Sequence, residues 1–349
     1  MRLTVVGNPD NRRVRLFADA VRAAGLPPPA VLPWREVAAG RVPVDPATVV
    51  RVDSPGEDAE VDRLLRRADR PASHGEIIGT SQWYRGLVIA ARRLAATGAP
   101  LLNPPDDLAV LFDKRRCHAV LHAAGVPVPA ALTAGTYADV RAAAWPRVFV
   151  KPAHGSSASG VLAVAFGPRG RVSALTSVEY AGGRLYNSLR VRRYGTEREV
   201  ASIVDSLAVD GLHVERWYPK AGYAGRTVDL RVVVIAGRPT HVVVRASRSP
   251  MTNLHLGNAR GDVAGLRAVA GPRAWTAALD TCVRVAGLFP GSLHVGVDLM
   301  FAPGWRRHAV AEVNAFGDLL PGLLSAQGRD TYAEEVHALA SGRFVPCPA

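Results

Sequence analysis

One stretch of the sequence, Leu293–Leu320, constrains the fold more than any other. Apolar and polar residues alternate on both sides of a short loop that contains Pro and Gly, which is the pattern of a β-hairpin. A loop centred near Trp305 places Asp298 opposite Glu312 on the neighbouring strand. Since successive side chains of a strand point to opposite faces, Asn314 then shares the face of these two carboxylates. The opposite face carries the apolar residues Val297, Leu299, Ala311 and Val313.

The facing carboxylates of Asp298 and Glu312 predict a bound cation. Like charges directly opposite each other destabilise a sheet, so we expect positive charge between them. Removal of either carboxylate is then expected to relieve a repulsion. Two carboxylates and an amide oxygen form the hard ligand set that suits Mg²⁺ held together with substrate phosphates. The hairpin therefore predicts a magnesium site of Asp298, Glu312 and Asn314, with a solvated acidic sheet face as the alternative.

Length and composition favour a globular protein of more than one domain. A chain of 349 residues is long enough for two or three domains, and a hydrophobic content of 48% can fill their cores. No apolar run approaches the length of a membrane span, and the first residues lack the apolar core of a signal peptide. The three cysteines are scattered without a metal-binding or disulfide spacing. We therefore expect a cytoplasmic protein without a membrane partner.

The basic residues carry a second signal. A net charge of +13 is compatible with nucleic-acid binding, but the charge is spread along the chain without a basic tail or a zinc-finger spacing, which disfavours that function. Phosphorylated small ligands match the charge equally well. Of 43 basic residues only three are lysines, Lys114, Lys151 and Lys220. Because arginine serves elsewhere, these lysines are candidates for sites that need a compact ammonium on a flexible stem.

The first hundred residues have the pattern of an α/β domain with a parallel sheet. No Gly-x-Gly-x-x-Gly loop follows its strands, so a dinucleotide site lacks support. The polar stretch 70–86 is interpreted as either a substrate loop or a plain surface loop. The expected strands are 3–7, 30–34 and 49–53, and the expected helices are 12–24 and 57–68.

Two Pro residues after Asn103 mark a boundary, and the chain beyond it alternates helices with hairpins. A loop of Gly and Ser between strands at 147–152 and 161–166 predicts a nest for phosphate oxygens, with Lys151 at the end of the first strand. An extra β segment at 169–195 places Arg190 and Arg192 on one face, facing either water or an anionic substrate. Further expected elements are helices at 113–124, 196–209, 275–286 and 330–340, a strand at 212–219, and a hairpin at 228–247 with Asp229 and Arg231 on one face and Arg245 on its second strand.

This order of parts resembles the ATP-grasp superfamily. The matching features are Asp-Lys before a helix, a strand ending in Lys-Pro with a Gly/Ser loop, an acidic linker strand, an Asp-x-Arg hairpin, and a Gly-Val-Asp hairpin followed by Glu-x-Asn. The stretch Asn253–Gly257 is similar to one in the amino-acid ligases that extend peptides and the tail of a ribosomal protein. The resemblance covers roughly residues 103–324. It implies an α+β fold with a Rossmann-like domain at 1–104, a lid subdomain at 105–211 that includes the extra segment 169–195, and a C-terminal subdomain with the magnesium site at 212–349.

The resemblance also implies roles for individual residues. Lys114, Lys151 and Asp229 would contact the phosphates, the adenine edge and the ribose of ATP. Arg231 and Arg245 would be catalytic residues that stabilise the phosphates and the transferred phosphoryl group. The remaining nucleotide contacts would be Ser156, Ser157 and Gly160 in a flexible loop and Glu215 and Trp217 in a hinge strand; the magnesium ligands would be Asp298, Glu312 and Asn314; and Asn253, His255, Arg190 and Arg192 are candidates for the substrate side. Lys220, in the loop after the hinge strand, is expected to matter less for ATP than Lys151.

The activity implied by the resemblance is an ATP- and Mg²⁺-dependent ligase that joins a carboxylate to an amine through an acyl phosphate. Its substrates would be small molecules or peptides, and no covalent protein nucleophile is needed. One alternative is a small-molecule kinase of the same fold, which would form a stable phosphate ester without an amine. Another is a nucleotide- or nucleic-acid-binding regulator without turnover, which would bind nucleic acid with a steep salt dependence.

Overall fold

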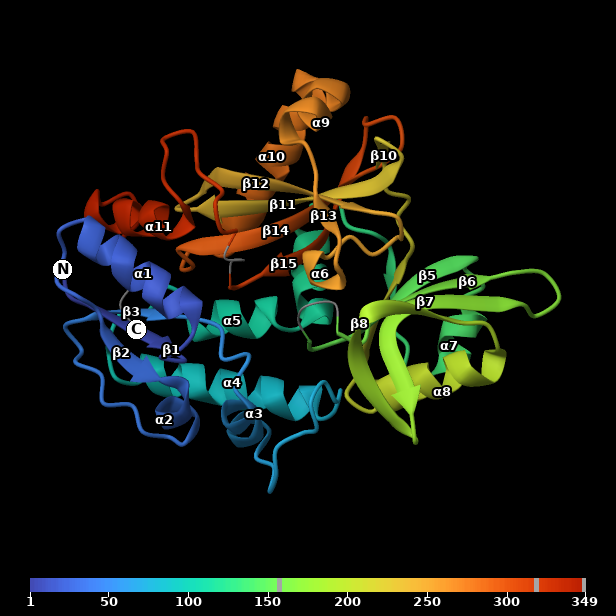
Figure 1. Cartoon of the computed structure of the whole chain (residues 1–349), viewed down its shortest axis with the longest axis horizontal. Coiled ribbons are helices and arrows are strands. Elements are labelled where there is room, and N and C mark those ends of the chain that lie inside the picture. The colour runs from blue at the N-terminus through green and yellow to red at the C-terminus, as the bar shows by residue number, and fades with distance from the viewer. Residues whose placement is uncertain (156–158, 317–319, 347–349) are drawn as a thin grey trace.

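The computed structural model describes residues 1–155, 159–316 and 320–346 (Figure 1). Within these ranges the strands form three sheets: a small one near the N-terminus and two larger ones that face each other across the middle of the molecule. The mixed α+β architecture agrees with the expected fold class. No helix of the described residues is long and apolar enough to cross a membrane.

The N-terminal sheet is parallel, as its α/β pattern predicts. Its strand order is β2-β1-β3, so that β1 lies at its centre. Helix α4 is an element that the periodicity does not predict, because its first turns belong to the polar stretch 70–86. Gly86 lets α4 approach α3 closely, since a Cβ atom there would lie 2.0 Å from the Leu65 carbonyl oxygen. The elements are β1 (Leu3–Gly7), α1 (Arg12–Ala23), β2 (Ala30–Pro33), α2 (Trp34–Ala38), β3 (Val49–Val52), α3 (Ala59–Arg66) and α4 (Thr80–Ala95).

The second sheet, called the lid sheet below, is antiparallel with the strand order β4-β9-β5-β6-β7-β8. The extra β segment is confirmed as the two strands β7 and β8 at its edge. Strand β9 pairs with β4 and β5, so it belongs to this sheet although the expected boundary after residue 211 places it in the C-terminal subdomain. The elements are β4 (Ala131–Leu132), α7 (Tyr137–Ala142), β5 (Arg147–Pro152), β6 (Leu162–Phe166), β7 (Val172–Ala181), β8 (Arg184–Tyr194), α8 (Glu197–Ala208) and β9 (Leu212–Arg216).

The third sheet, the C-terminal sheet, is antiparallel with the order β13-β12-β11-β14-β15, and β10 pairs with β11. Its elements and the helices around it are α5 (Pro105–Leu111), α6 (Lys114–Ala123), β10 (Gly222–Tyr223), β11 (Arg226–Ile235), β12 (Arg238–Ser247), the short 3₁₀ helix η1 (Leu254–Leu256), β13 (Ala259–Arg260), α9 (Val263–Ala270), α10 (Pro272–Gly287), β14 (His294–Phe301), β15 (His308–Asn314) and α11 (Thr331–Ala340).

Strand β11 shows why the C-terminal sheet can carry a polar site. Val232 and Val234 point to the core cluster that includes α10, whereas Val233 and Ile235 point to the cluster that includes α1 and α11. Strands buried on both faces need apolar residues at every position, which explains this unbroken apolar run. Asp229 lies on the same face as Val233 but nearer the start of the strand, where the lid sheet lies opposite. One strand face therefore changes from apolar to charged along its length.

The predicted C-terminal hairpin is confirmed, including its register. Asp298 of β14 lies opposite Glu312 of β15. A register shift between Asp298 and Leu299 then pairs Leu299 with Val310, which leaves Ala311 without an opposite residue. We expected Ala311 on the face opposite the carboxylates, but the bulge interrupts the alternation there and Ala311 lines the same cleft as Asp298 and Glu312. The Ala311 carbonyl instead accepts a hydrogen bond from the Lys151 ammonium at 3.5 Å.

The stretch 70–86 divides in two: residues 70–79 form a largely exposed loop, as one of the two interpretations expects, whereas residues 80–86 are the first turns of α4. The loop also joins the N-terminal region to the lid sheet. The backbone N–H of Ile77 donates to the carbonyl of Leu185 in β8 at 2.8 Å. Helix α4 begins at Thr80 without a capping side chain of its own. Asp210, from the turn between α8 and β9, takes that place: its carboxylate accepts from the Thr80 N–H at 3.0 Å and from the Ser81 hydroxyl at 2.6 Å.

We predict that Asp210→Ala lowers the free energy of unfolding by about 1 kcal/mol, the usual cost of losing a helix N-cap. Urea unfolding at neutral pH measures the change. Asp19→Ala is the control, because this carboxylate forms only an exposed pair with Arg22 and should cost less than about 0.5 kcal/mol. Equal effects of the two substitutions would show that Asp210 does not cap α4.

Candidate active site

A cleft with an empty volume of about 750 Å³ lies between the lid sheet and the C-terminal sheet. The lid sheet contributes Phe149, Lys151 and Glu215, and the loop after β12 contributes Met251, Thr252 and Asn253. The C-terminal sheet contributes charged residues from four strands, and Lys114 reaches the cleft from the start of α6. These charged residues are Asp229, Arg245, Asp298 and Glu312.

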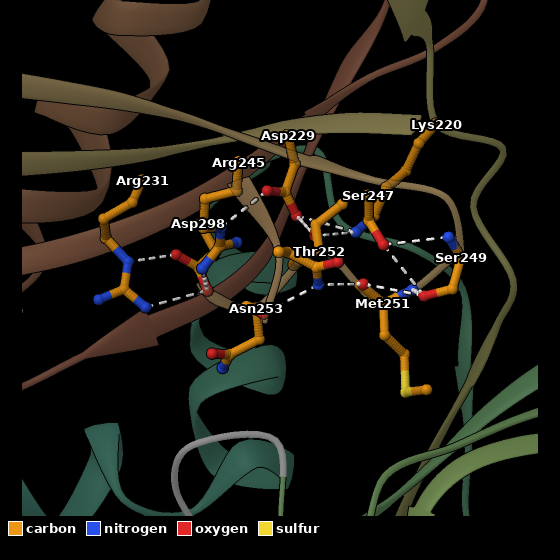
Figure 2. A network of polar contacts seen from close by, with 12 residues as sticks. Lys220, Asp229, Arg231, Arg245, Ser247, Ser249, Met251, Thr252, Asn253 and Asp298 are labelled. Carbon is orange, nitrogen blue, oxygen red and sulfur yellow. Dashed lines mark hydrogen bonds and ion pairs between the residues drawn. The ribbon is translucent and has the colours of Figure 1, made fainter. Parts of the chain in front are cut away.

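The strand register places opposite charges next to each other on the C-terminal sheet. Arg245 lies opposite Asp229, and Arg231 lies opposite Asp298. Figure 2 shows the resulting chain of contacts. Arg245 Nε donates to Asp229 Oδ1 at 2.8 Å, and its Nη1 donates to Asp298 Oδ2 at 3.1 Å. Arg231 binds both oxygens of Asp298, with its Nη2 at 3.2 Å from Oδ2. Directly opposite residues of opposite charge stabilise a sheet, so this row holds itself in place.

The repulsion expected between Asp298 and Glu312 is therefore compensated by protein side chains. Asp298 is paired with Arg231 and Arg245, and Glu312 is paired with Lys114 at 3.2 Å. Burial alone would raise the pKa of Glu312, but Lys114, Lys151 and Arg231 lower it. Burial would likewise lower the pKa of Arg245, yet Asp229 and Asp298 raise it. This charge arrangement argues against the expectation that removing Asp298 relieves a repulsion.

All three lysines of the chain line this cleft. Each one pairs with a single carboxylate: Lys114 with Glu312 at 3.2 Å, Lys151 with Glu215 at 2.5 Å, and Lys220 with Asp229 at 2.8 Å. Burial would raise the pKa of Glu215, but the adjacent Lys151 and His213 lower it to about 2. The scarcity of lysine thus indicated the location of the cleft, including Lys220, which we had expected to matter less.

One wall of the cleft is apolar. Phe149 and Met251 belong to a small core cluster, against which Val161 packs. Trp217 packs against Phe149, with ring centroids 5.1 Å apart, but does not itself line the cleft. The flat ring of a nucleotide base fits against such a wall. The polar edge of the base would need hydrogen-bonding groups, which the neighbouring hinge strand β9 can supply. The sequence did not single out Phe149 or Met251, since single apolar residues look like core residues.

The start of the Gly/Ser loop is fixed by Lys114. The Lys114 N–H donates to the Ala153 carbonyl at 2.9 Å, and its ammonium donates to the Gly155 carbonyl at 2.6 Å. Between these residues, His154 is buried, with its Nε2 atom 3.3 Å from Asp113 Oδ2. Gly160 has a φ of +73°, and a Cβ atom there would lie 2.6 Å from a Pro152 side-chain carbon, so this position requires glycine. The predicted phosphate contacts Ser156 and Ser157 lie outside the described residues.

The predicted substrate residues occupy different places. Asn253 lines the cleft, and its side chain turns away from the chain of ion pairs (Figure 2). His255 is exposed on η1 and is not among the cleft-lining residues. Arg190 is exposed in a four-residue bulge of β8, whereas Arg192 binds Glu179. Of the two arginines, Arg190 is therefore the one without an ion-pair partner among the described residues.

The candidate magnesium ligands fit a site in which substrate phosphates supply the remaining ligands of the ion. Among the described residues, no three His, Cys, Asp or Glu side chains gather into a site that could hold a metal ion. Mg²⁺, however, is often held by one or two carboxylates together with substrate phosphates and water. The Glu312 side chain is 31% exposed and faces the cleft beside Asp298. Asn314 is not among the cleft-lining residues, and its Nδ2 atom donates to the Gly296 carbonyl oxygen at 3.4 Å.

We predict that Glu215 contributes stability only above acidic pH. Its pKa is lowered from 4.5 to about 2 in the folded protein, so its contribution is full above pH 4.5 and disappears as the pH falls towards 2. The difference in unfolding free energy between the wild type and Glu215→Gln should therefore shrink over that window. Urea unfolding at pH 7, 4.5 and 3 measures it; a constant difference would contradict the pairing with Lys151.

We predict that Asp298→Asn destabilises the ligand-free protein by about 3 kcal/mol or more, because it leaves buried arginine charge uncompensated. Glu312→Gln is the matched control in the same ladder, and its more exposed carboxylate should matter less. Urea unfolding without nucleotide or metal compares the two variants. A stability of Asp298→Asn at or above that of the wild type would instead support net repulsion between the facing carboxylates.

No protein-family model matches the sequence, and no curated protein matches it either. Solved structures do match in fold. The D-cycloserine synthetase DcsG is 18% identical, with 98% of this chain and 100% of that chain covered and a TM-score of 0.59. The macrocyclase MdnC from Microcystis aeruginosa MRC, bound with the precursor peptide MdnA, is 12% identical, with 98% and 100% covered and a TM-score of 0.56. The ATP-grasp ligase PsnB, complexed with a minimal precursor, is 18% identical, with 98% and 99% covered and a TM-score of 0.55. Over nearly its whole length, the chain has the fold of the ATP-grasp ligases.

Proposed function

We propose that this protein is an ATP- and Mg²⁺-dependent ligase that joins a carboxylate to an amine through an acyl phosphate. The observation that carries this proposal is the composition of the cleft. Three lysines and Arg245 line the same cleft as an apolar wall, beside the two carboxylates Asp298 and Glu312. A nucleotide triphosphate combines a flat base with a chain of negative charge, and this cleft offers a complementary surface for each part.

The ammonium groups are suited to hold the phosphates. Lys114 and Lys151 lie at the junction of the two sheets, where each already contacts one carboxylate and one backbone carbonyl oxygen. Phosphate oxygens would take the donors that these contacts leave over, and charge-assisted hydrogen bonds are the strong ones. Mg²⁺ held by Asp298 and Glu312 would supply neutralisation of the phosphate charge.

The proposed reaction has two steps. A carboxylate oxygen of the acid attacks the γ-phosphorus of ATP, the bond to the β–γ bridging oxygen breaks, and ADP leaves. The amine then attacks the acyl carbon, inorganic phosphate leaves, and the amine loses a proton as the amide forms. Arg245 and Lys114 would stabilise the charge that develops on the transferred phosphoryl group, which is the main catalytic task in phosphoryl transfer. The lid sheet over the cleft would limit water, which otherwise hydrolyses the acyl phosphate.

The structural neighbours support a peptide or amino-acid substrate class. PsnB and MdnC were solved with precursor peptides, and DcsG is a D-cycloserine synthetase. PsnB was also solved with Mg and ADP, which agrees with the cofactors proposed for this cleft. We therefore propose that the acid and the amine come from peptides or amino-acid-like molecules. Asn253, at the cleft end of the loop before η1, would contact the acceptor.

The test is a screen for ADP release from ATP and Mg²⁺ with pools of peptides and amino acids, followed by mass spectrometry of the products. We expect ADP release that requires both an acid and an amine, with loss of one water from the joined product. Glu312→Gln should abolish turnover while the protein stays folded. ADP release with one substrate and a stable phosphate ester would show a kinase instead, and the absence of release with every pair would contradict the ligase.

A further inference from the structure

Lys220 is the one lysine for which neither the resemblance nor the proposed reaction supplies a role. It follows β9 in the turn that leads to β10, and its side chain is only 11% exposed. The chain uses arginine for 40 of its 43 basic residues, yet it keeps lysine here as at the two other cleft positions. Arg231 and Arg245, with the carboxylates that they bind, are called the arginine row below. Among the described residues, the cations that line the cleft outside this row are all lysines.

The contacts of Lys220 use two of its three hydrogen-bond donors. Its Nζ atom donates to Asp229 Oδ2 at 2.8 Å and to Thr252 Oγ1 at 2.8 Å. Thr252 in turn donates its hydroxyl hydrogen to Asp229 (Figure 2). An ammonium has three donors, and the described residues supply acceptors for two of them. Lys220 lines the cleft, so its third donor is available there.

The same pattern recurs at the other two lysines. Lys114 binds Glu312 and the Gly155 carbonyl, and Lys151 binds Glu215 and the Ala311 carbonyl. Each ammonium thus has one carboxylate, one neutral oxygen and one donor left over. These left-over donors belong to three residues around one cleft, so a ligand with several anionic oxygens would supply acceptors for all of them.

The guanidinium of arginine would not serve at position 220. Lys220 reaches its two acceptors with a single nitrogen, whereas arginine presents a planar fork whose donors lie further apart. Arg245 already occupies Asp229 Oδ1 from the other side. A second guanidinium at this carboxylate would displace Thr252, and with it the loop that carries Asn253.

We infer that Lys220 donates its third hydrogen bond to an anionic oxygen of the ligand in the cleft. The inference rests on the proposed function, because the candidate ligands are the nucleotide and the acid substrate. A phosphate oxygen and a carboxylate oxygen share this chemistry, so the experiment has one arm for each source. Burial lowers the pKa of Lys220, so an anion beside it would also favour its charged form.

The first arm titrates adenosine, AMP, ADP and a non-hydrolysable ATP analogue, each with Mg²⁺, into the wild type and Lys220→Met by calorimetry. If the source is a phosphate, Lys220→Met should weaken the phosphorylated ligands by about tenfold or more and leave adenosine unchanged. Lys151→Met is the positive control for a phosphate contact. Arg273→Met is the matched negative control, because it removes one exposed positive charge from a residue that does not line the cleft.

The second arm measures the KM of the acid found in the ADP-release screen. If the source is its carboxylate, Lys220→Met should raise that KM by about tenfold and leave nucleotide affinity unchanged. Thr252→Val distinguishes a direct contact of Lys220 with the ligand from a role of Lys220 in positioning the loop. It removes the hydrogen bonds of Thr252 to Lys220 and Asp229 but keeps the ammonium. If Thr252→Val reproduces the whole effect, or if Lys220→Met alters neither arm or weakens adenosine equally, the inference is overturned. The proposed function has a separate contradicting outcome: a wild type that binds nucleotide but releases no ADP with any acid and amine.

Discussion

The cross-strand pairing of charges on the C-terminal sheet is the interaction on which the site depends. Arg231 and Asp298 are directly opposite each other, and Arg245 reaches both Asp229 and Asp298. Buried charges of this kind persist only when they are paired and hydrogen-bonded, since desolvation otherwise exceeds the attraction. The pairing fixes the positions of the carboxylates before any ligand binds. The same strands bury apolar residues further along, so the core of the protein and the row of charges share one rigid support.

Arginine and lysine occupy different places around the C-terminal sheet. Arg231 and Arg245 lie within the sheet, where a planar fork can hold two carboxylate oxygens or bridge two carboxylates. The lysines surround that row and reach it from α6, β5 and the turn after β9. At each of these positions a single ammonium contacts one carboxylate and one neutral oxygen.

The sequence predicted the parts of the fold that periodicity controls. The alternation in β14 and β15 predicted the pairing of Asp298 with Glu312, and the expected helix at 196–209 is α8. It could not predict the bulge at Ala311, because one inserted residue leaves the local alternation intact. It also could not predict that Asp210 caps α4, since this contact joins segments about 130 residues apart. The partners of Asp298 were hidden for a related reason: Arg231 and Arg245 were recognised, but only the strand order shows that they neutralise it.

The ion pairs of the cleft differ in whether they lie within one sheet or connect two sheets. The arginine pairs lie within one sheet, so they are set by the strand register. Lys114 connects Glu312 of the C-terminal sheet to Gly155 after β5, and Lys151 connects Glu215 of the lid sheet to Ala311 of the C-terminal sheet. These two lysines therefore link the lid sheet to the C-terminal sheet, whereas the arginine pairs hold Asp298 within a single sheet.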